Sequence, residues 1–179
     1  MAAEVALEQE PIRDTFVVAC FTGVRISDTD KLDLDIQIEG SRPILRFATQ
    51  KTGETVSVPL APSVVRILNR YGGTLPAYTD QYFNREIKKI CETAGITSRV
   101  RKLNTAGGRK SFEVREKWEL VSSHTARRSF ATNAYLAGLD LIVISKITGH
   151  TTTKALMDYI KASDIDLANK AAKNPFFEF

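Results

Sequence analysis

Apolar residues near the start of the chain recur at helical spacing. Four of them fall on one face of a helix: Ile12, Phe16, Val17 and Cys20. Pro11 suits the first turn of such a helix because its backbone torsion is already helical, and Gly23 suits the position that ends one. The pattern therefore predicts a helix that starts near Pro11 and ends before Gly23.

Alternation of apolar and polar residues replaces helical spacing in the next stretch. After a short helical turn that follows Ser27, residues 34–38 alternate as a strand does. Two further strands fit 44–49 and 55–59, and the turn between them carries Lys51. We expect a small three-stranded antiparallel sheet with Lys51 at the tip of its second hairpin.

Helical spacing returns after residue 60. One helix is predicted from about Pro62 to Arg70, and a longer one near 80–94. The longer helix is expected to bury Phe83, Ile87, Cys91 and Ala94. The basic stretch 96–121 then fits a β-hairpin around Gly107 and Gly108, since paired glycines favour a tight turn.

Four short helices are predicted in the remaining chain. Ser123 is expected to cap a helix from His124 to about Ala137, and Asp140 to cap one that ends before Gly149. Thr151 or Thr152 caps a short helix that carries Tyr159, and a last helix runs from Ser163 to about Lys173. The order of elements predicts an α+β domain that is mostly helical.

Composition narrows the class of protein. The chain has 179 residues with 43% hydrophobic and 26% charged residues, values typical of a globular domain. It has no apolar run near the roughly 20 residues that span a bilayer, and its acidic N-terminus is unlike a secretion signal. We expect Cys20 and Cys91 to be free core thiols of a cytoplasmic protein. Two histidines and no zinc-type spacing predict that it holds no metal.

Positive charge is unevenly distributed. The formal net charge is +4, yet residues 99–128 contain nine Lys or Arg and three Asp or Glu. Such a concentration favours a polyanion bound on one face. A solvated charged surface explains it equally well, so charge alone leaves both interpretations open.

His124 and Arg127 lie three residues apart at the start of a predicted helix. That spacing places both side chains on one face, and the helix N-terminus adds positive potential. A phosphodiester suits these features because guanidinium presents a planar fork to two oxygens. The pair alone is a weak motif, and an ordinary structural role is the more frequent outcome.

Tyr159 and Arg25 each have both an ordinary and a chemical interpretation. Tyr159 follows His150 by nine residues across a short helix, so phenol and imidazole can share a site, but a lone tyrosine usually packs in a core. A phenol has a pKa near 10 and needs cations or a base to attack at neutral pH. Arg25 lies just after a predicted helix and is well placed to point toward a ligand. Its ordinary role would be a salt bridge with Asp28 or Asp30.

The conjunction of these motifs resembles the tyrosine recombinase (phage integrase) family from about residue 11 to residue 160. In chain order they are Thr-Gly-Val-Arg-Ile-Ser-Asp, Lys-Thr-Gly, His-Thr-Ala-Arg-Arg-Ser-Phe-Ala-Thr and Thr-Gly-His followed by Tyr. The segments 124–132 and 147–159 are the most specific. The resemblance is closest to integrases of mobile elements such as conjugative transposons, and it implies the fold of DNA breaking–rejoining enzymes.

The resemblance implies a transesterification. Arg25 and Arg127 would clamp the phosphate, and Tyr159 would attack it, giving a 3′-phosphotyrosine link and a free 5′ hydroxyl. Negative charge builds on the equatorial oxygens during attack, so fixed cations stabilise the transition state more than the ground state. No cofactor or metal is required.

Supporting roles also follow from the resemblance. Lys51 would protonate the departing 5′ oxygen, His124 would take part in acid–base work, and His150 would hydrogen-bond the scissile phosphate. Asp28 would support the site, and Arg128 stands where many relatives have a second histidine. The expected catalytic set is Arg25, Lys51, His124, Arg127, His150 and Tyr159. The expected DNA contacts are Arg99, Arg101, Lys102, Arg109, Lys110 and Arg128.

The implied partner is double-stranded DNA, bound by a homotetramer whose isolated subunit is a monomer. We expect residues 1–10 to be a linker remnant after a DNA-clasping domain, 11–173 the catalytic domain, and 174–179 a tail. The three aromatic residues of this tail suit docking on a neighbouring subunit or folding back on the core.

A type IB topoisomerase is an alternative function that His124 disfavours. A DNA-binding regulatory module is another, but it would not need the complete set.

Overall fold

The computed structural model describes residues 6–31, 35–39, 42–49, 53–106 and 108–177. Its α-helices are α1 (Glu10–Thr22), α2 (Pro62–Arg70), α3 (Asp80–Thr93), α4 (Ser123–Leu136), α5 (Leu141–Thr148), α6 (Thr153–Tyr159) and α7 (Asp164–Ala171). Its strands are β1 (Asp35–Glu39), β2 (Arg42–Ala48), β3 (Thr55–Pro59), β4 (Arg99–Ala106) and β5 (Arg109–Glu116). Short 3₁₀ segments are η1 (Leu7–Gln9), η2 (Ile26–Lys31), η3 (Lys117–Leu120) and η4 (Pro175–Phe177).

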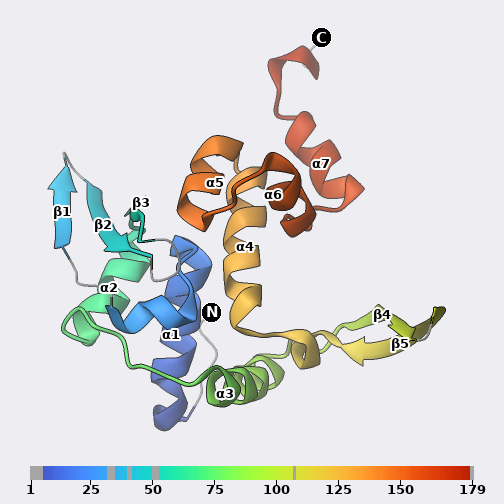
Figure 1. Ribbon diagram of the computed structural model, residues 1–179, viewed down its shortest axis with the longest axis horizontal. Coiled ribbons are helices and arrows are strands. Elements are labelled where there is room, and N and C mark those ends of the chain that lie inside the picture. The colour runs from blue at the N-terminus through green and yellow to red at the C-terminus, as the bar shows by residue number, and fades with distance from the viewer. Residues whose placement is uncertain (1–5, 32–34, 40–41, 50–52, 107, 178–179) are drawn as a thin grey trace.

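The helices form the body, and the two sheets lie at its margins (Figure 1). Strands β1, β2 and β3 make one antiparallel sheet in that order, as the alternation predicts. In β3, Val56 and Val58 are buried while their neighbours are exposed. Strands β4 and β5 form a separate hairpin that extends away from α3 and α4. The mostly helical α+β class is confirmed.

Gly23 sets the position of α1 against α4. It ends α1 with a φ of 69° in the left-handed region, as the sequence predicts. A Cβ at this position would lie 2.5 Å from Cδ1 of Phe130 in α4. Both the backbone conformation and the available space therefore require glycine. The end of α1 is thereby brought directly onto α4.

The buried apolar residues form two clusters. The larger one joins α1, α2, α3, α4 and the three-stranded sheet. The smaller one is made by Ala131, Ile144, Leu156 and Ile160, and Tyr159 packs against it. The helix that carries Tyr159 is thus attached to the body through α4 and α5.

Two local predictions are wrong. Ser122 rather than Ser123 caps α4, because the backbone at Ser122 is still extended and its N–H donates to the Thr125 hydroxyl at 3.0 Å. Ser123 is already helical, and its N–H donates to Oδ1 of Asn84 at 2.7 Å. Ala94 is exposed, because α3 ends at Thr93 and the chain turns before that position can reach the core.

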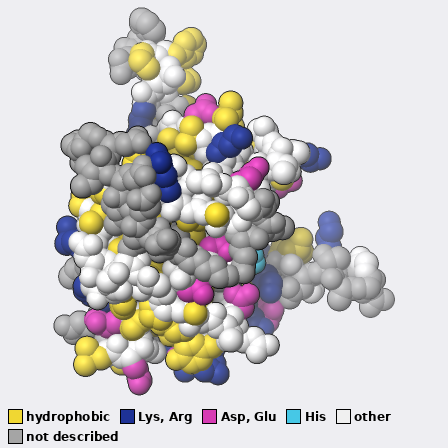
Figure 2. All heavy atoms as spheres, turned by 60° about the vertical axis from the view of Figure 1, so that its left-hand side comes forward, with side chains coloured by type: hydrophobic (Ala, Val, Ile, Leu, Met, Phe, Trp, Pro, Cys, Tyr) yellow, Lys and Arg dark blue, Asp and Glu magenta, His cyan; other side chains and the backbone are white. Residues whose placement is uncertain are grey.

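The cysteines, the helix lengths and the C-terminal segment can also be compared with the predictions. Cys20 and Cys91 are both free thiols, and burial raises the pKa of Cys20 to about 12. Within the described ranges, no helix is long and apolar enough to cross a bilayer. Phe176 and Phe177 are 73% and 61% exposed and contact each other edge to face, so they are not folded back on the core. Figure 2 shows hydrophobic side chains of this C-terminal segment standing clear of the body.

Candidate active site

Arg127 is the most deeply buried cation of the expected set. Its side chain leaves α4 and is only 6% exposed. One terminal nitrogen donates to the carbonyl of Gly23 at 2.5 Å, and the other donates to the carbonyl of Thr148. The guanidinium is therefore fixed between the end of α1 and the end of α5, with further donors left for a ligand.

Arg25 lies beside Arg127 although 102 positions separate them in the chain. A Cβ built on Gly149 would lie 3.9 Å from Nη2 of Arg127 and 4.0 Å from Nη2 of Arg25. The two guanidinium groups thus face the same glycine, whose φ of 59° ends α5. Nη1 of Arg25 lies 3.9 Å from Oδ2 of Asp28, a carboxylate that is 2% exposed. This long contact compensates the charge of Arg25 only in part.

The electrostatics of the pair favour an anion. Burial and the neighbouring Arg25 lower the pKa of Arg127 to about 10, while Tyr159 and Asp28 act in the opposite direction. Arg127 still carries its charge at neutral pH. Two cations held close together bind the oxygens of a phosphodiester favourably, because the bound anion relieves their mutual repulsion.

His150 is held by Thr148 in a defined orientation. The Thr148 hydroxyl lies 2.6 Å from the carbonyl of Ile144, to which it must donate, and 2.7 Å from Nδ1 of His150. Nδ1 is therefore the donor to Thr148, and neutral His150 offers Nε2 as an acceptor. Burial lowers the pKa of His150, and so do Arg127 and Arg25. A bound phosphate would raise that pKa again and allow Nε2 to donate.

Tyr159 ends α6 next to His150. The two ring centroids are 4.8 Å apart at an angle of 52°. The phenolic O–H donates to the main-chain carbonyl of His124 at 3.3 Å. Burial raises the pKa of Tyr159, while Arg127, Arg128 and Arg25 act to lower it. A phosphate positioned by the two arginines would thus meet a phenol that lies within their field.

His124 and Arg128 flank this centre on α4. His124 is exposed at the side chain and helps to line a cavity of about 70 Å³ with Arg25, Ser27 and Arg127. Arg128 places its guanidinium carbon 5.4 Å from the centroid of the Tyr159 ring, which is the geometry of a cation–π contact. This contact on the Tyr159 ring was not predicted from the sequence.

The structure brings together four of the six expected catalytic side chains, Arg25, Arg127, His150 and Tyr159, with His124 at the edge of the group. Lys51 lies outside the described residues. The expected DNA contacts divide between two places: Arg128 lies on α4, and the others lie on the hairpin. Arg99, Arg101, Lys102 and Lys110 are exposed there, whereas the side chain of Arg109 is outside the described part.

Sequence reasoning missed three contributors to the site. The carbonyls of Gly23 and Thr148 orient Arg127, and the hydroxyl of Thr148 orients His150. A main-chain carbonyl occurs at every position and leaves no signal. Thr148, however, belongs to the Thr-Gly-His motif, and its adjacency to a candidate histidine could have suggested a supporting role.

Comparison with known proteins agrees with this geometry. The model of the phage integrase family matches residues 4–165. The chain belongs to that family. A curated relative, tyrosine recombinase XerC of Pelotomaculum thermopropionicum, is 32% identical over 142 residues, which cover 76% of this chain and 45% of the relative. The chain thus spans about half the length of that relative and corresponds to a tyrosine recombinase catalytic domain.

Solved structures of recombinases share the fold. The XerH site-specific recombinase bound to its palindromic difH substrate has a TM-score of 0.62 and 19% identity, over 95% of this chain and 47% of that one. The XerA recombinase has a TM-score of 0.60 and 18% identity, over 95% and 65%. The Tn1549 transposon integrase in complex with circular intermediate DNA has a TM-score of 0.57 and 17% identity, over 96% and 60%. These similarities establish the fold of the recombinase domain.

Proposed function

We propose that this integrase-family domain cleaves and rejoins duplex DNA by transesterification, with Tyr159 as the nucleophile. The observation that carries the proposal is the adjacency of the Arg25 and Arg127 guanidinium groups, which meet at Gly149 beside the His150–Tyr159 pair. Binding alone would not need a buried arginine that is fixed by two main-chain carbonyls close to a tyrosine. A scissile phosphate placed on the two guanidinium groups would have its negative charge neutralised during attack.

The proposed step conserves atoms and charge. The phenolic oxygen of Tyr159 forms a bond to phosphorus, the bond from phosphorus to the 5′ oxygen breaks, and a 3′-phosphotyrosine remains. The phenol must lose a proton and the 5′ oxygen must gain one. His124, at the edge of the same site, is proposed to assist the first transfer, while His150 is proposed to hydrogen-bond the phosphate through Nε2. Lys51 is proposed as the donor in the second transfer, on the family resemblance. Attack by another 5′ hydroxyl reverses the reaction.

The proposed partner is double-stranded DNA, engaged by the exposed cations of the hairpin and by Arg128. Two structural relatives, XerH and the Tn1549 integrase, are described as bound to DNA, which supports this partner. We also propose assembly as a homotetramer on DNA, with integration or excision of a mobile element as the reaction. The isolated domain should sediment as a monomer, and a stable tetramer without DNA would contradict that part.

A nicked suicide duplex tests the proposed chemistry. Cleavage next to the nick releases a short strand, so the covalent protein–DNA adduct accumulates and appears as a slow band on a denaturing gel. Wild-type protein should form this band, and Tyr159→Phe should abolish it while DNA binding persists. Tyr82→Phe, which alters an exposed tyrosine of α3, is the matched control and should form the band normally. An adduct formed by Tyr159→Phe would refute the assignment.

A further inference from the structure

The β4–β5 hairpin has two unlike faces. Its register places Leu103 opposite Phe112 and Arg101 opposite Val114. Side chains alternate across a strand, so these four residues share one face. Phe112 is 68% exposed, Val114 58% and Leu103 49%. A cluster of large apolar side chains is thus presented to solvent, on an arm that extends beyond the body (Figure 1).

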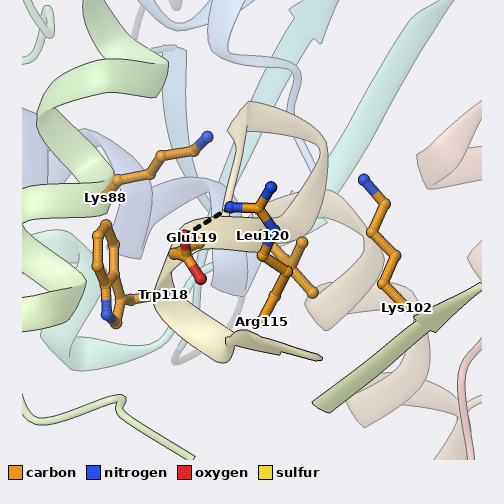
Figure 3. Close-up of a pocket in the computed structure, with 6 residues that line it drawn as sticks. All are labelled: Lys88, Lys102, Arg115, Trp118, Glu119 and Leu120. Atoms are coloured by element: carbon orange, nitrogen blue, oxygen red, sulfur yellow. Dashed lines mark hydrogen bonds and ion pairs between the residues drawn. The ribbon is translucent and has the colours of Figure 1, made fainter. Parts of the chain in front are cut away.

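The other face of the hairpin is directed toward the body. Lys102 and Arg115 line a cavity of about 310 Å³ together with Lys88, Trp118, Glu119 and Leu120 (Figure 3). Arg115 is paired with Glu119 at 3.0 Å. Trp118 packs against the main core and donates to Glu116 at 2.6 Å. The base of the arm is therefore anchored, and the face with Phe112 is held outward in a fixed direction.

The charge of the arm, together with its exposed apolar face, favours a polyanionic partner. Residues 99–116 contain six Lys or Arg and two Glu, an excess of four. The whole chain also has a net charge of +4, so the rest of the molecule is neutral in sum. On the outward face, Arg101 and Lys110 stand on either side of the Leu103–Phe112 pair along the arm. This arrangement complements a polyanion that offers apolar groups between its charges.

We propose that the outward face of the β4–β5 hairpin enters the major groove of the DNA substrate and reads its sequence there. The major groove is about 12 Å wide and admits a two-stranded β-ribbon. Lys110 is paired with a residue four positions after Arg101 in β4. At about 3.3 Å per residue, Arg101 and Lys110 are therefore separated by roughly 13 Å along the arm. This length is close to the width of the groove, so the two side chains would contact DNA at opposite ends of the apolar cluster. Leu103 and Phe112 would contact thymine methyl groups, and Arg101 would bind guanine.

This inference rests on the proposed function, because it assumes that DNA is the substrate. It adds that one defined arm supplies sequence preference at a distance from the reacting phosphate. A protein partner fits the charge less well, since it would need both an acidic surface and an apolar recess.

A library of nicked duplexes with random sequence tests the inference. Wild-type protein is incubated with the library, covalent adducts are isolated, and the attached DNA is sequenced. We expect a short window of base preference at a fixed distance from the cleaved phosphate, with about tenfold or greater discrimination at its best positions. The double variant Leu103→Ser and Phe112→Ser should lose the thymine preference within that window, while preference beside the cleaved phosphate persists. Leu7→Ser, which alters an exposed leucine in η1, is the control and should leave both intact.

Replacement of thymine by deoxyuridine, which removes only the methyl group, provides the second measurement. Within the window it should reduce adduct formation by wild-type protein and have no effect on the double variant. The inference would be overturned if the double variant kept the full base preference of the wild type. It would also be overturned if the double variant kept that preference and lost only the ability to assemble into oligomers on DNA. Failure of wild-type protein to form any adduct would instead count against the proposed function.

Discussion

Arg25 and Arg127, which form the proposed phosphate clamp, carry the same charge as the arginines of the hairpin but lie in opposite surroundings. Arg127 is 6% exposed and is fixed by two main-chain carbonyls, whereas Arg101 stands on an exposed strand. A buried, oriented cation acts strongly on one nearby phosphate because little water screens it. Exposed cations act on many phosphates weakly, and salt screens them. The comparison teaches that the position of a cation, more than its charge, would decide whether it serves the proposed catalysis or the proposed DNA affinity.

The largest effect is expected from Arg127→Ala. Loss of a fixed electrostatic stabiliser should reduce the rate of suicide-DNA cleavage by about 10²- to 10⁴-fold at saturating DNA. Arg127→Lys keeps a charge but cannot reproduce the planar fork, so it should remain strongly impaired. Thermal unfolding of each variant verifies that it is folded. Cleavage at nearly the wild-type rate by the folded alanine variant would remove the basis for the clamp.

The hairpin should show the converse behaviour. In Arg101→Ala with Lys110→Ala, DNA affinity should fall by about tenfold at low salt. The slope of log K against log salt should decrease by about 0.9 because Lys110 no longer neutralises a phosphate, whereas loss of the proposed guanine contact of Arg101 weakens binding at every salt concentration. The cleavage rate at saturating DNA should stay close to wild type. Titrations at several salt concentrations, paired with single-turnover cleavage, check this. A reduced rate with unchanged affinity would erase the proposed distinction between the two groups.

Arg128 sharpens the comparison because it is exposed yet lies over the Tyr159 ring. Burial raises the pKa of Tyr159, and Arg128 is among the cations that lower it. Arg128→Ala should therefore raise that pKa and displace the rising limb of the cleavage–pH profile to higher pH. The deficit, up to about tenfold per pH unit of displacement, should shrink as pH increases. Arg128→Lys should restore part of it, and Arg66→Ala on α2 is the control. A deficit that is constant across pH would indicate a purely structural role.

The smallest effect is expected in the pH dependence of stability. Burial lowers the pKa of His150 below 6.5, and Arg127 and Arg25 act in the same direction. The folded state thus favours the neutral ring, so its contribution is complete above pH 6.5 and is lost as pH falls through the folded-state pKa. Between pH 7.5 and 5.5 the Tm of wild-type protein should decrease more than that of His150→Gln. Equal decreases would exclude this contribution.

Local patterns predicted most of the fold. The helix that ends at Gly23, the strand Thr55–Pro59 and the helix Pro62–Arg70 all lie where the sequence indicates. Each depends on interactions within a few residues, such as a cap, a turn or an alternating face. The cap of α4 was misplaced by one residue because two adjacent serines satisfy the same local rule, and the contact with Asn84 is long-range.

The candidate site was predictable in its members and not in its geometry. Arg25, Arg127, His150 and Tyr159 were identified because they occur together in a recognisable order. Their orientation depends on two main-chain carbonyls and one hydroxyl, which periodicity does not reveal. The position of Arg128 over the Tyr159 ring likewise depends on how α6 packs on α4. Tertiary packing, rather than residue type, decides such details.

The anchoring of Arg127 has a consequence for how this domain tolerates mutation. Both of its described acceptors are peptide oxygens, and a peptide oxygen survives any replacement of the side chain attached to it. Substitutions of the residues around Arg127 can therefore change the side chains near the guanidinium without changing its orientation, provided that the turn at Gly23 is kept. The hairpin lacks this protection, because the groups through which we propose that it contacts DNA are side chains.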